Sequence, residues 1–111
     1  MAKRPKNKRD VPPFVRLEID MLFNNPEWKN LSSSAKLFYL YLKASYNSFN
    51  NGEIILSYSL LKNTKGISSP KTISKAIREL EKKEWVKVTN RGGMYGNSNR
   101  YKLTWKYDGL K

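Results

Sequence analysis

The chain has 111 residues, a length that predicts one domain with a modest hydrophobic core. It contains no cysteine and no histidine, which excludes disulfides, thiolate chemistry, imidazole general bases and the commonest metal ligand. Because 22 Lys and Arg stand against 9 Asp and Glu, the formal net charge is +13 and we expect a polyanionic partner: DNA, RNA or an anionic membrane surface.

The N-terminal residues 1–13 combine basic side chains with prolines and little to bury, a composition typical of a disordered basic arm. Such an arm can follow a DNA groove, or it can be a solubilising terminus only. A single domain is expected over residues 14–105, with 106–111 as a C-terminal tail. Its first part alternates in hydropathy, which predicts an extended entry passing into a short helix near Ile19–Asn24.

A turn is expected at residues 24–26, followed by Trp28 packing back onto the core. Apolar residues then recur at helical spacing and predict a central helix over residues 31–49 with Ser32 as its N-cap. The apolar surface of this helix covers most of its circumference, so we expect it to be the hub of the core. Its recurring members are Ala35, Phe38, Leu42, Tyr46 and Phe49.

The segment 50–52, Asn-Asn-Gly, is expected to end that helix, and residues 53–56 read as a short strand. Ser57 is expected to cap a second helix that runs to about Lys65. Gly66 then closes the helix in the left-handed conformation, and Ile67 follows as a buried residue of the turn.

The next helix is predicted over about residues 69–84, with Ser69 as N-cap and Pro70 at the first helical position. Winding this segment as a helix separates two faces. The apolar face holds Ile73, Ala76, Ile77 and Leu80. The opposite face is a stripe of Lys71, Lys75, Arg78 and Lys82, with Thr72 and Ser74 at its margins. A basic stripe suits DNA, although many charged faces are only solvated.

Two strands follow, over residues 85–89 and 99–105, joined by the glycine-rich loop 90–98 as a long hairpin. The second strand is expected to place Tyr101, Leu103 and Trp105 on one face, and the tail to pack through Tyr107. The helices joined by residues 65–68 form a helix-turn-helix, and the hairpin after it is a wing. The predicted fold class is therefore α+β and mostly helical, with a three-helix core, a C-terminal wing and a short extra N-terminal element.

The stretch ISSPKTISKAIRELEKKEWVKV, followed by a glycine-containing loop and NRYKLT, resembles winged helix-turn-helix DNA-binding domains. The upstream stretches FVRLEIDML, PEWKNLSSSAKLFYLYLKASYN and NNGEIILSYSLL narrow the resemblance to plasmid replication initiators and phage-type replication proteins. The similarity covers about residues 14–105. Because no second winged-helix, helicase-loading or catalytic domain follows in this sequence, a small stand-alone transcriptional regulator is an alternative to an initiator.

This resemblance implies that the helix from Ser69 is a recognition helix in the major groove of double-stranded DNA. The implied base-edge candidates are Ser69, Lys71, Thr72, Lys75 and Arg78. The phosphate and wing candidates are Lys62, Asn63, Lys65, Ser74, Lys82, Arg91, Tyr95, Asn97 and Arg100. Arg91, which we place near the wing tip, could enter a minor groove. A homodimer is one arrangement, for which the aromatic N-terminal segment offers an interface.

No nucleotide-binding glycine motif is present, so we expect no cofactor. The helical residues Glu79, Glu81 and Glu84 do not suggest a metal-dependent nuclease, because neighbouring lysines neutralise them, and we expect no enzymatic activity. No apolar run could span a bilayer and no secretory signal follows the basic N-terminus, so we expect a cytoplasmic protein, nucleoid-associated when bound to DNA, without a membrane partner. Two alternatives remain: a winged-helix protein-interaction module and an RNA-binding basic domain.

Overall fold

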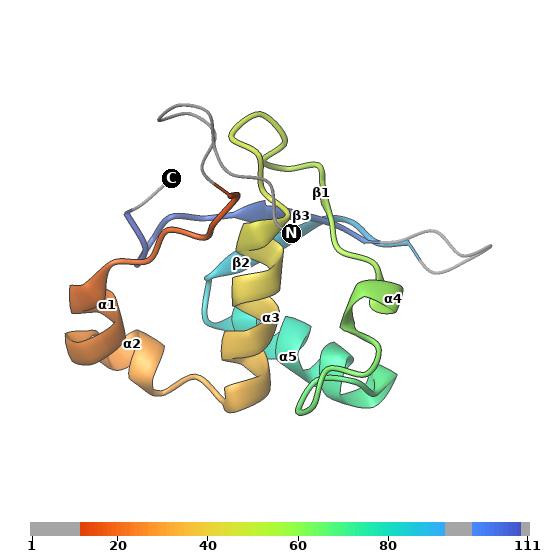
Figure 1. Cartoon of the computed structure of the whole chain (residues 1–111), viewed down its shortest axis with the longest axis horizontal. Helices are drawn as coiled ribbons and strands as arrows, with labels where there is room; N and C mark the ends of the chain where they lie inside the picture. Colours follow the sequence, from red (N-terminus) through yellow and green to blue (C-terminus); the bar gives the residue numbers. More distant parts are fainter. Residues whose placement is uncertain (1–11, 93–98, 110–111) are drawn as a thin grey trace, which may run out of the picture.

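The computed structural model describes residues 12–92 and 99–109. In chain order its elements are α1 (Ile19–Asn24), α2 (Pro26–Lys29), α3 (Ser33–Ala44), β1 (Ile54–Ile55), α4 (Tyr58–Leu61), α5 (Pro70–Lys82), β2 (Val86–Asn90) and β3 (Arg100–Leu103) (Figure 1). This order confirms the predicted fold class, an α+β winged helix-turn-helix that is mostly helical. The predicted arm lies almost wholly outside the described residues. No described helix combines the length and apolarity that spanning a membrane requires.

The N-terminal element has one more helix than the sequence analysis expected. The predicted short helix at Ile19–Asn24 is confirmed as α1. The expected turn after it is instead the start of α2, because the Asn25 side-chain oxygen accepts hydrogen bonds from the backbone N–H groups of Glu27 and Trp28 at 2.8 and 3.4 Å. Pro26 at the first position needs no hydrogen-bond partner for its nitrogen. Trp28 is 6% exposed and packs back onto the core, as predicted.

Helix α3 is the hub of the core, as predicted. The Ser32 hydroxyl caps it by accepting a hydrogen bond from the Ala35 backbone N–H at 3.2 Å. Ala35, Phe38 and Leu42 are completely buried along its length. In Figure 1 the helix stands between the α1–α2 pair and α4, with α5 beneath it. Its central position lets one helix organise both ends of the domain.

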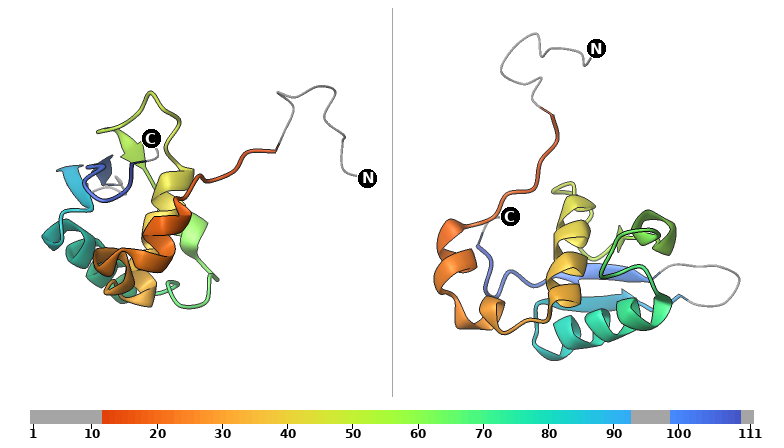
Figure 2. Two further views of the ribbon diagram at one scale, coloured as in Figure 1. Left: turned by 90° about the vertical axis from the view of Figure 1, so that its left-hand side faces the viewer. Right: turned by 60° about the horizontal axis from the view of Figure 1, so that its bottom comes forward.

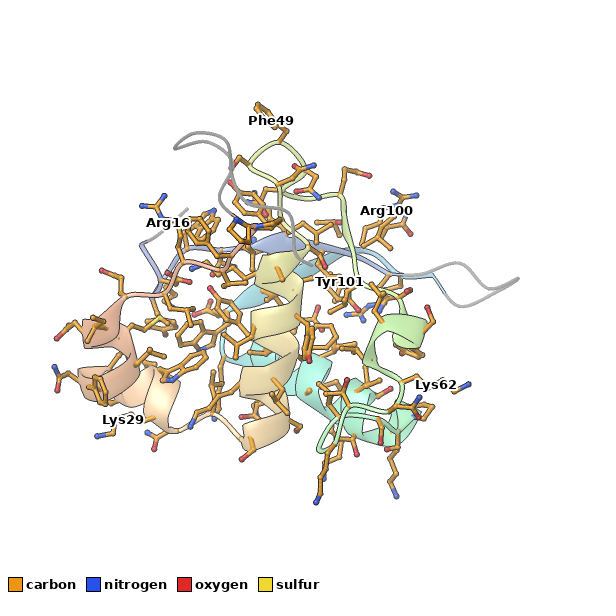
Figure 3. The ribbon with its side chains drawn as sticks, viewed as in Figure 1. Arg16, Lys29, Phe49, Lys62, Arg100 and Tyr101 are labelled. Atoms are coloured by element: carbon orange, nitrogen blue, oxygen red, sulfur yellow. The ribbon has the colours of Figure 1, made fainter. Side chains whose placement is uncertain are left out.

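The predicted extension of this helix to Phe49 is wrong, since α3 ends at Ala44. Beyond it the Asn50 amide donates to the carbonyl of Ser45 at 3.0 Å, and Ser48 has a left-handed φ of 76°. These local bonds replace the next turn of helix, as Asn and Ser side chains often do. Phe49 is consequently 95% exposed and contributes nothing to the apolar face (Figure 3).

The segment 50–52 is a turn leading into β1 and does not end α3. The second helix is also shorter than predicted, because α4 stops at Leu61 and Asn63 is left-handed with φ 69°. Ser57 occupies the N-cap position without a side-chain capping hydrogen bond, so the predicted cap is wrong. The link between α4 and α5 is therefore residues 62–69, longer than the predicted 65–68.

This longer link keeps two predicted features. Gly66 is left-handed with φ 93°, and a Cβ there would lie 3.3 Å from Leu37 Cδ1, so the position suits glycine alone. Because α4 has already ended, Gly66 shapes the turn and does not close the helix. Ile67 is completely buried, as predicted, and anchors the link to the core.

The sheet has the antiparallel order β1-β3-β2. The predicted hairpin is confirmed, with Val86 opposite Leu103 and Val88 opposite Tyr101 in the register of β2 and β3. The second strand is shorter than expected, because Trp105 has a left-handed φ of 58° and leaves the sheet. Its ring instead packs against Tyr46, with ring centroids 5.3 Å apart.

An aromatic cluster closes the core where α2 and α3 meet the segment after β3. The Trp85 ring contacts Trp28 and Tyr39 at centroid distances of 5.7 and 5.3 Å. Tyr107 of the C-terminal segment packs on the same Trp85 ring at 4.9 Å, which confirms that the tail packs through this residue. Such edge-on contacts stabilise more than their buried area alone. The cluster thereby fixes α2, α3 and the tail to the start of β2.

The arrangement leaves α5 on one side of the molecule. In the right-hand view of Figure 2, α5 lies along the lower edge, with α3 and the sheet above it. The α1–α2 pair and α4 lie on opposite sides of α3 along the long axis (Figure 1). One face of the domain is therefore formed mainly by the outward side of α5.

Candidate nucleic-acid interface

Helix α5 separates its apolar and basic residues as the sequence predicts. Its starting point is set by Ser69, whose hydroxyl oxygen accepts a hydrogen bond from the Thr72 backbone N–H at 3.1 Å, and by Pro70 at the first position. It ends at Lys82, slightly before the predicted 84. The residues that turn inward and are at most 4% exposed are Ile73, Ala76, Ile77 and Leu80.

The basic stripe lies on the opposite, solvent-facing side of α5. All four of its members are exposed: Lys71, Lys75, Arg78 and Lys82. None of them forms an ion pair with an acidic residue in the described part of the chain. Their charges are therefore available to an outside anion, whereas a paired cation would first have to leave its carboxylate.

The hydroxyl groups at the start of α5 form a local pair. Ser69 Oγ donates to Thr72 Oγ1 at 2.9 Å while it accepts from the Thr72 backbone N–H. Ser69 is thus committed to the helix start, but the Thr72 hydroxyl still has its own proton to donate. Thr72 is half-buried, whereas Ser74, one position beyond Ile73, is exposed. The Ser74 hydroxyl is therefore more accessible to a ligand than the Thr72 hydroxyl.

A groove of about 450 Å³ runs beside the stripe where α5 meets the N-terminus of α3. Its lining residues are Ser32, Ser34, Thr72, Lys75, Arg78 and Glu79. The sequence analysis assigned Ser32 only to capping and did not consider Ser34. The serine run at residues 32–34 was visible, but only the crossing of α3 and α5 brings it beside Lys75 and Arg78.

Glu79 places a negative charge beside Lys75 and Arg78 on the wall of this groove, and it joins α5 to α3. Its carboxylate oxygens accept hydrogen bonds from the Ser32 backbone N–H at 2.8 Å and the Ser32 hydroxyl at 2.7 Å. Partial burial raises the pKa of Glu79, but these two bonds and the nearby Lys83 outweigh that effect and hold it below its ordinary value. The carboxylate is consequently ionised and satisfied at neutral pH.

Residues of the link between α4 and α5 lie at the other end of the same side. Lys62, Asn63 and Lys65 are all exposed and follow α4, because that helix ends before them. Lys62 projects into solvent near the edge of the molecule in Figure 3. Neither lysine forms an ion pair within the described ranges.

The wing differs from the α5 face because its two predicted arginines, Arg91 and Arg100, are both paired with acids. Arg91 Nη2 contacts both carboxylate oxygens of Glu81 at 2.7 and 2.8 Å, which holds Arg91 at the base of the wing and not near its tip. Arg100 Nη1 lies 3.1 Å from Glu53 Oε1. The remaining predicted wing residues, Tyr95 and Asn97, lie outside the described residues.

Asn99 closes the base of the wing. Its side-chain oxygen accepts a hydrogen bond from the Gly92 backbone N–H at 2.9 Å, and its amide donates to the Tyr101 hydroxyl at 3.3 Å. Burial of the Tyr101 ring raises the pKa of its hydroxyl to about 12, so this hydroxyl stays protonated. The sequence analysis placed Asn99 only at the start of the second strand and gave its uncharged side chain no role.

The three glutamates of the α5 region have separate cationic partners. Glu79 pairs with Lys83, Glu81 with Arg91, and the carboxylate of Glu84 with Lys106. Over residues 12–92 and 99–109, no three acidic side chains gather in a way that could hold a metal ion. These carboxylates therefore act in ion pairs, and the pair of Glu81 with Arg91 joins α5 to the base of the hairpin.

The fold and the exposed cationic side of α5 define a helix-turn-helix domain of the winged type. A family model described as a helix-turn-helix domain matches residues 29–86, more than half of the chain, and the chain belongs to this family. The match spans α3, β1, α4 and α5. No curated protein and no solved structure matches the chain. As a member of a helix-turn-helix family, the protein is a DNA-binding domain.

Proposed function

We propose that the protein binds double-stranded DNA sequence-specifically, with α5 in the major groove. The observation that carries this proposal is the outward side of α5, where Lys71, Lys75, Arg78 and Lys82 are exposed and free of acidic partners in the described part of the chain. A major groove accepts an α-helix and presents acceptor atoms of guanine to cationic side chains. The net charge of +13 adds attraction to the phosphate backbone.

The residues of the stripe have different roles in this arrangement. Lys71 and Lys75, in the first half of α5, donate to guanine O6 and N7, and the Thr72 hydroxyl donates beside them. Arg78 lies further along and contacts either a guanine or a phosphate. Lys82, near the end of α5, contacts phosphate only. Ser69 fixes the start of the helix, and its backbone lies next to the DNA.

Residues around α5 contact the phosphates of the DNA. On one side of the major groove the DNA backbone is contacted by Lys62, Asn63, Lys65 and Ser74. Ser34 contacts the DNA backbone from the start of α3. Arg91 and Arg100 orient the wing through Glu81 and Glu53, and they contact DNA only by leaving those partners. Tyr95, Asn97 and the basic arm add contacts along the backbone or minor groove.

The test begins with binding sites selected from a random duplex library. In the double variant Lys71→Ala/Lys75→Ala we expect the preference for the selected site over scrambled DNA to disappear while salt-sensitive binding persists. The cause is that base-edge contacts specify, whereas phosphate contacts only position. Discrimination should fall by roughly 30-fold or more, since each of the two lost base contacts is worth about 1–3 kcal/mol. Fluorescence anisotropy measures both affinities.

The matched control is Lys87→Ala/Lys102→Ala. These two exposed lysines face each other across β2 and β3 and carry the same charge, but they lie off α5. The control variant should bind selected and scrambled DNA with equally reduced affinity, and its site preference should be unchanged. If the α5 double variant kept full discrimination, the assigned recognition helix would be wrong.

The biological role we propose is control of plasmid or phage-type replication initiation or of transcription, without catalytic activity and without a membrane partner. Such work takes place in the cytoplasm, on the nucleoid. Competition among duplex DNA, duplex RNA and single strands separates this function from RNA binding. The burial of Phe38, Trp85 and Tyr101 argues against base stacking on these rings. Absence of any nucleic-acid affinity at low salt would favour a protein-interaction module.

A further inference from the structure

Helix α1 carries an apolar surface that the fold leaves uncovered. Ile19 and Phe23, four residues apart and therefore on one side of the helix, are 71% and 68% exposed. Phe14, in the extended segment leading into α1, is 70% exposed. We call these three side chains the α1 surface. The opposite side of the same helix does pack, since Met21 is 2% exposed. Large apolar side chains left exposed in this way mark an interaction site.

Charge around the α1 surface does not favour nucleic acid as its partner. Glu18, Asp20 and Glu27 lie in or beside α1 and α2, so acids are concentrated here although the whole chain is strongly basic. Arg16 and Lys29 add cations to the same rim. A rim of mixed sign offers phosphate little net attraction but suits a surface of the same composition, because acids of one copy can face bases of another.

From these observations we infer that the α1 surface joins two copies of this chain when both are bound to DNA; this inference rests on the proposed function. The α1–α2 pair forms one end of the molecule, while α5 lies along its lower side (Figures 1 and 2). A two-fold axis passing beside α1, perpendicular to the long axis, therefore turns both α5 helices toward the same DNA. The longest extent is 43 Å, so each α5 lies within that distance of the contact and the two helices are less than three DNA turns of about 34 Å apart.

The size of the surface decides when the pair forms. Three such side chains bury on the order of 400 Å² per copy, or roughly 800 Å² in total, which is less than the ~1,200 Å² of a stable interface. Copies free in solution are therefore monomeric. DNA that carries two half-sites holds the copies side by side, and the resulting effective concentration makes the weak contact form.

A single introduced cysteine tests the contact directly, because the natural chain has none. In Phe23→Cys, side chains related by the two-fold axis come together and form a disulfide under mild oxidation. We expect dimer formation at least tenfold faster on a duplex with two inverted half-sites than on a single half-site duplex, by effective concentration. Non-reducing gels measure the rate. The matched control is Phe49→Cys, an exposed aromatic position on the loop beyond α3, far from α1 (Figure 3).

A second variant measures the contribution of the α1 surface to cooperative DNA binding without a disulfide. Ile19→Ser/Phe23→Ser changes exposed side chains, so the fold should survive, and circular dichroism verifies this. We expect unchanged affinity for one half-site and loss of cooperativity on two. The inference is overturned if the double variant keeps the cooperativity of the unsubstituted protein. It is also overturned if Phe23→Cys and Phe49→Cys cross-link at equal rates. In either case a different protein, or another segment of the chain, covers α1. Failure to bind a single half-site overturns the proposed function instead.

Discussion

Glu79 shows how one side chain can set the position of the basic stripe. It lies on α5, yet both of its carboxylate oxygens accept hydrogen bonds from Ser32 at the start of α3. Ser32 in turn caps α3 through its contact with the Ala35 backbone N–H. The rotation of α5 about its own axis, and with it the direction of Lys75 and Arg78, is thereby tied to the end of another helix.

We predict that Glu79→Gln destabilises the protein by about 1–2 kcal/mol at pH 7, because bonds to a charged acceptor are stronger than bonds to a neutral one. The pKa of Glu79 is below its ordinary value of 4.5 in the folded state. Its stabilising effect is therefore fully present above pH 4.5 and is lost as the pH falls through the lower folded value. Urea unfolding at pH 7 and at pH 3 should show a difference at pH 7 that shrinks at pH 3.

The control for this charge is Glu53→Gln. Glu53 pairs with Arg100, but its side chain is 70% exposed, so its removal should cost less than about 0.5 kcal/mol at either pH. An equal loss for both variants, or a Glu79→Gln effect that does not change with pH, would contradict the proposed role of the carboxylate.

At the scale of elements, a buried ion pair attaches the C-terminal segment to α3. Lys43 Nζ lies 2.6 Å from Asp108 Oδ2, with side-chain exposures of 4% and 1%. The Tyr39 hydroxyl donates to the same carboxylate oxygen at 2.6 Å. Burial, and then the adjacent carboxylate, raise the pKa of Tyr39, so its hydroxyl remains a donor. Lys43 also donates to the carbonyl of Arg16, so the ion pair joins both ends of the domain.

We predict that Asp108→Asn lowers the free energy of unfolding by about 3 kcal/mol, because it leaves the buried Lys43 ammonium without a countercharge. Asparagine keeps an oxygen for Tyr39, so the variant isolates the charge. Denaturant unfolding measures the loss. As a comparison, Glu84→Gln removes the exposed pairing with Lys106 and should leave stability nearly unchanged. Similar stability losses in the two variants would show that burial does not govern these pairs.

The elements that sequence analysis located correctly are those with strong local signals. Helix α5 has an N-cap, a proline at its first position and an apolar period, and all three agree. Helix α3 has an equally clear start but no local stop signal before Phe49, and side-chain hydrogen bonds from Asn50 end it earlier. Helix α2 was missed because it is only 4 residues long, too short for a period to appear.

At the scale of the whole molecule, charge governs both attraction to DNA and its salt dependence. The logarithm of the binding constant should fall linearly with the logarithm of salt concentration, by about 0.9 for each phosphate contact. We predict that Lys82→Ala reduces this slope by about one without changing site preference. Arg16→Ala removes an equal charge from the side away from α5 (Figure 3) and should leave the slope on a single half-site unchanged. Titrations at four salt concentrations measure both.

The sequence by itself determined the class of fold, the location of α5 with its basic stripe and the strongly basic character, because periodicity, capping residues and net charge are local or additive properties. Tertiary structure alone decided which charges are free. Arg91 and Lys75 look alike in sequence, but folding brings Arg91 to Glu81 and leaves Lys75 open beside Ser34. The pairing of side chains far apart in sequence depends on how α3, α5 and the hairpin cross, and no local pattern contains that information.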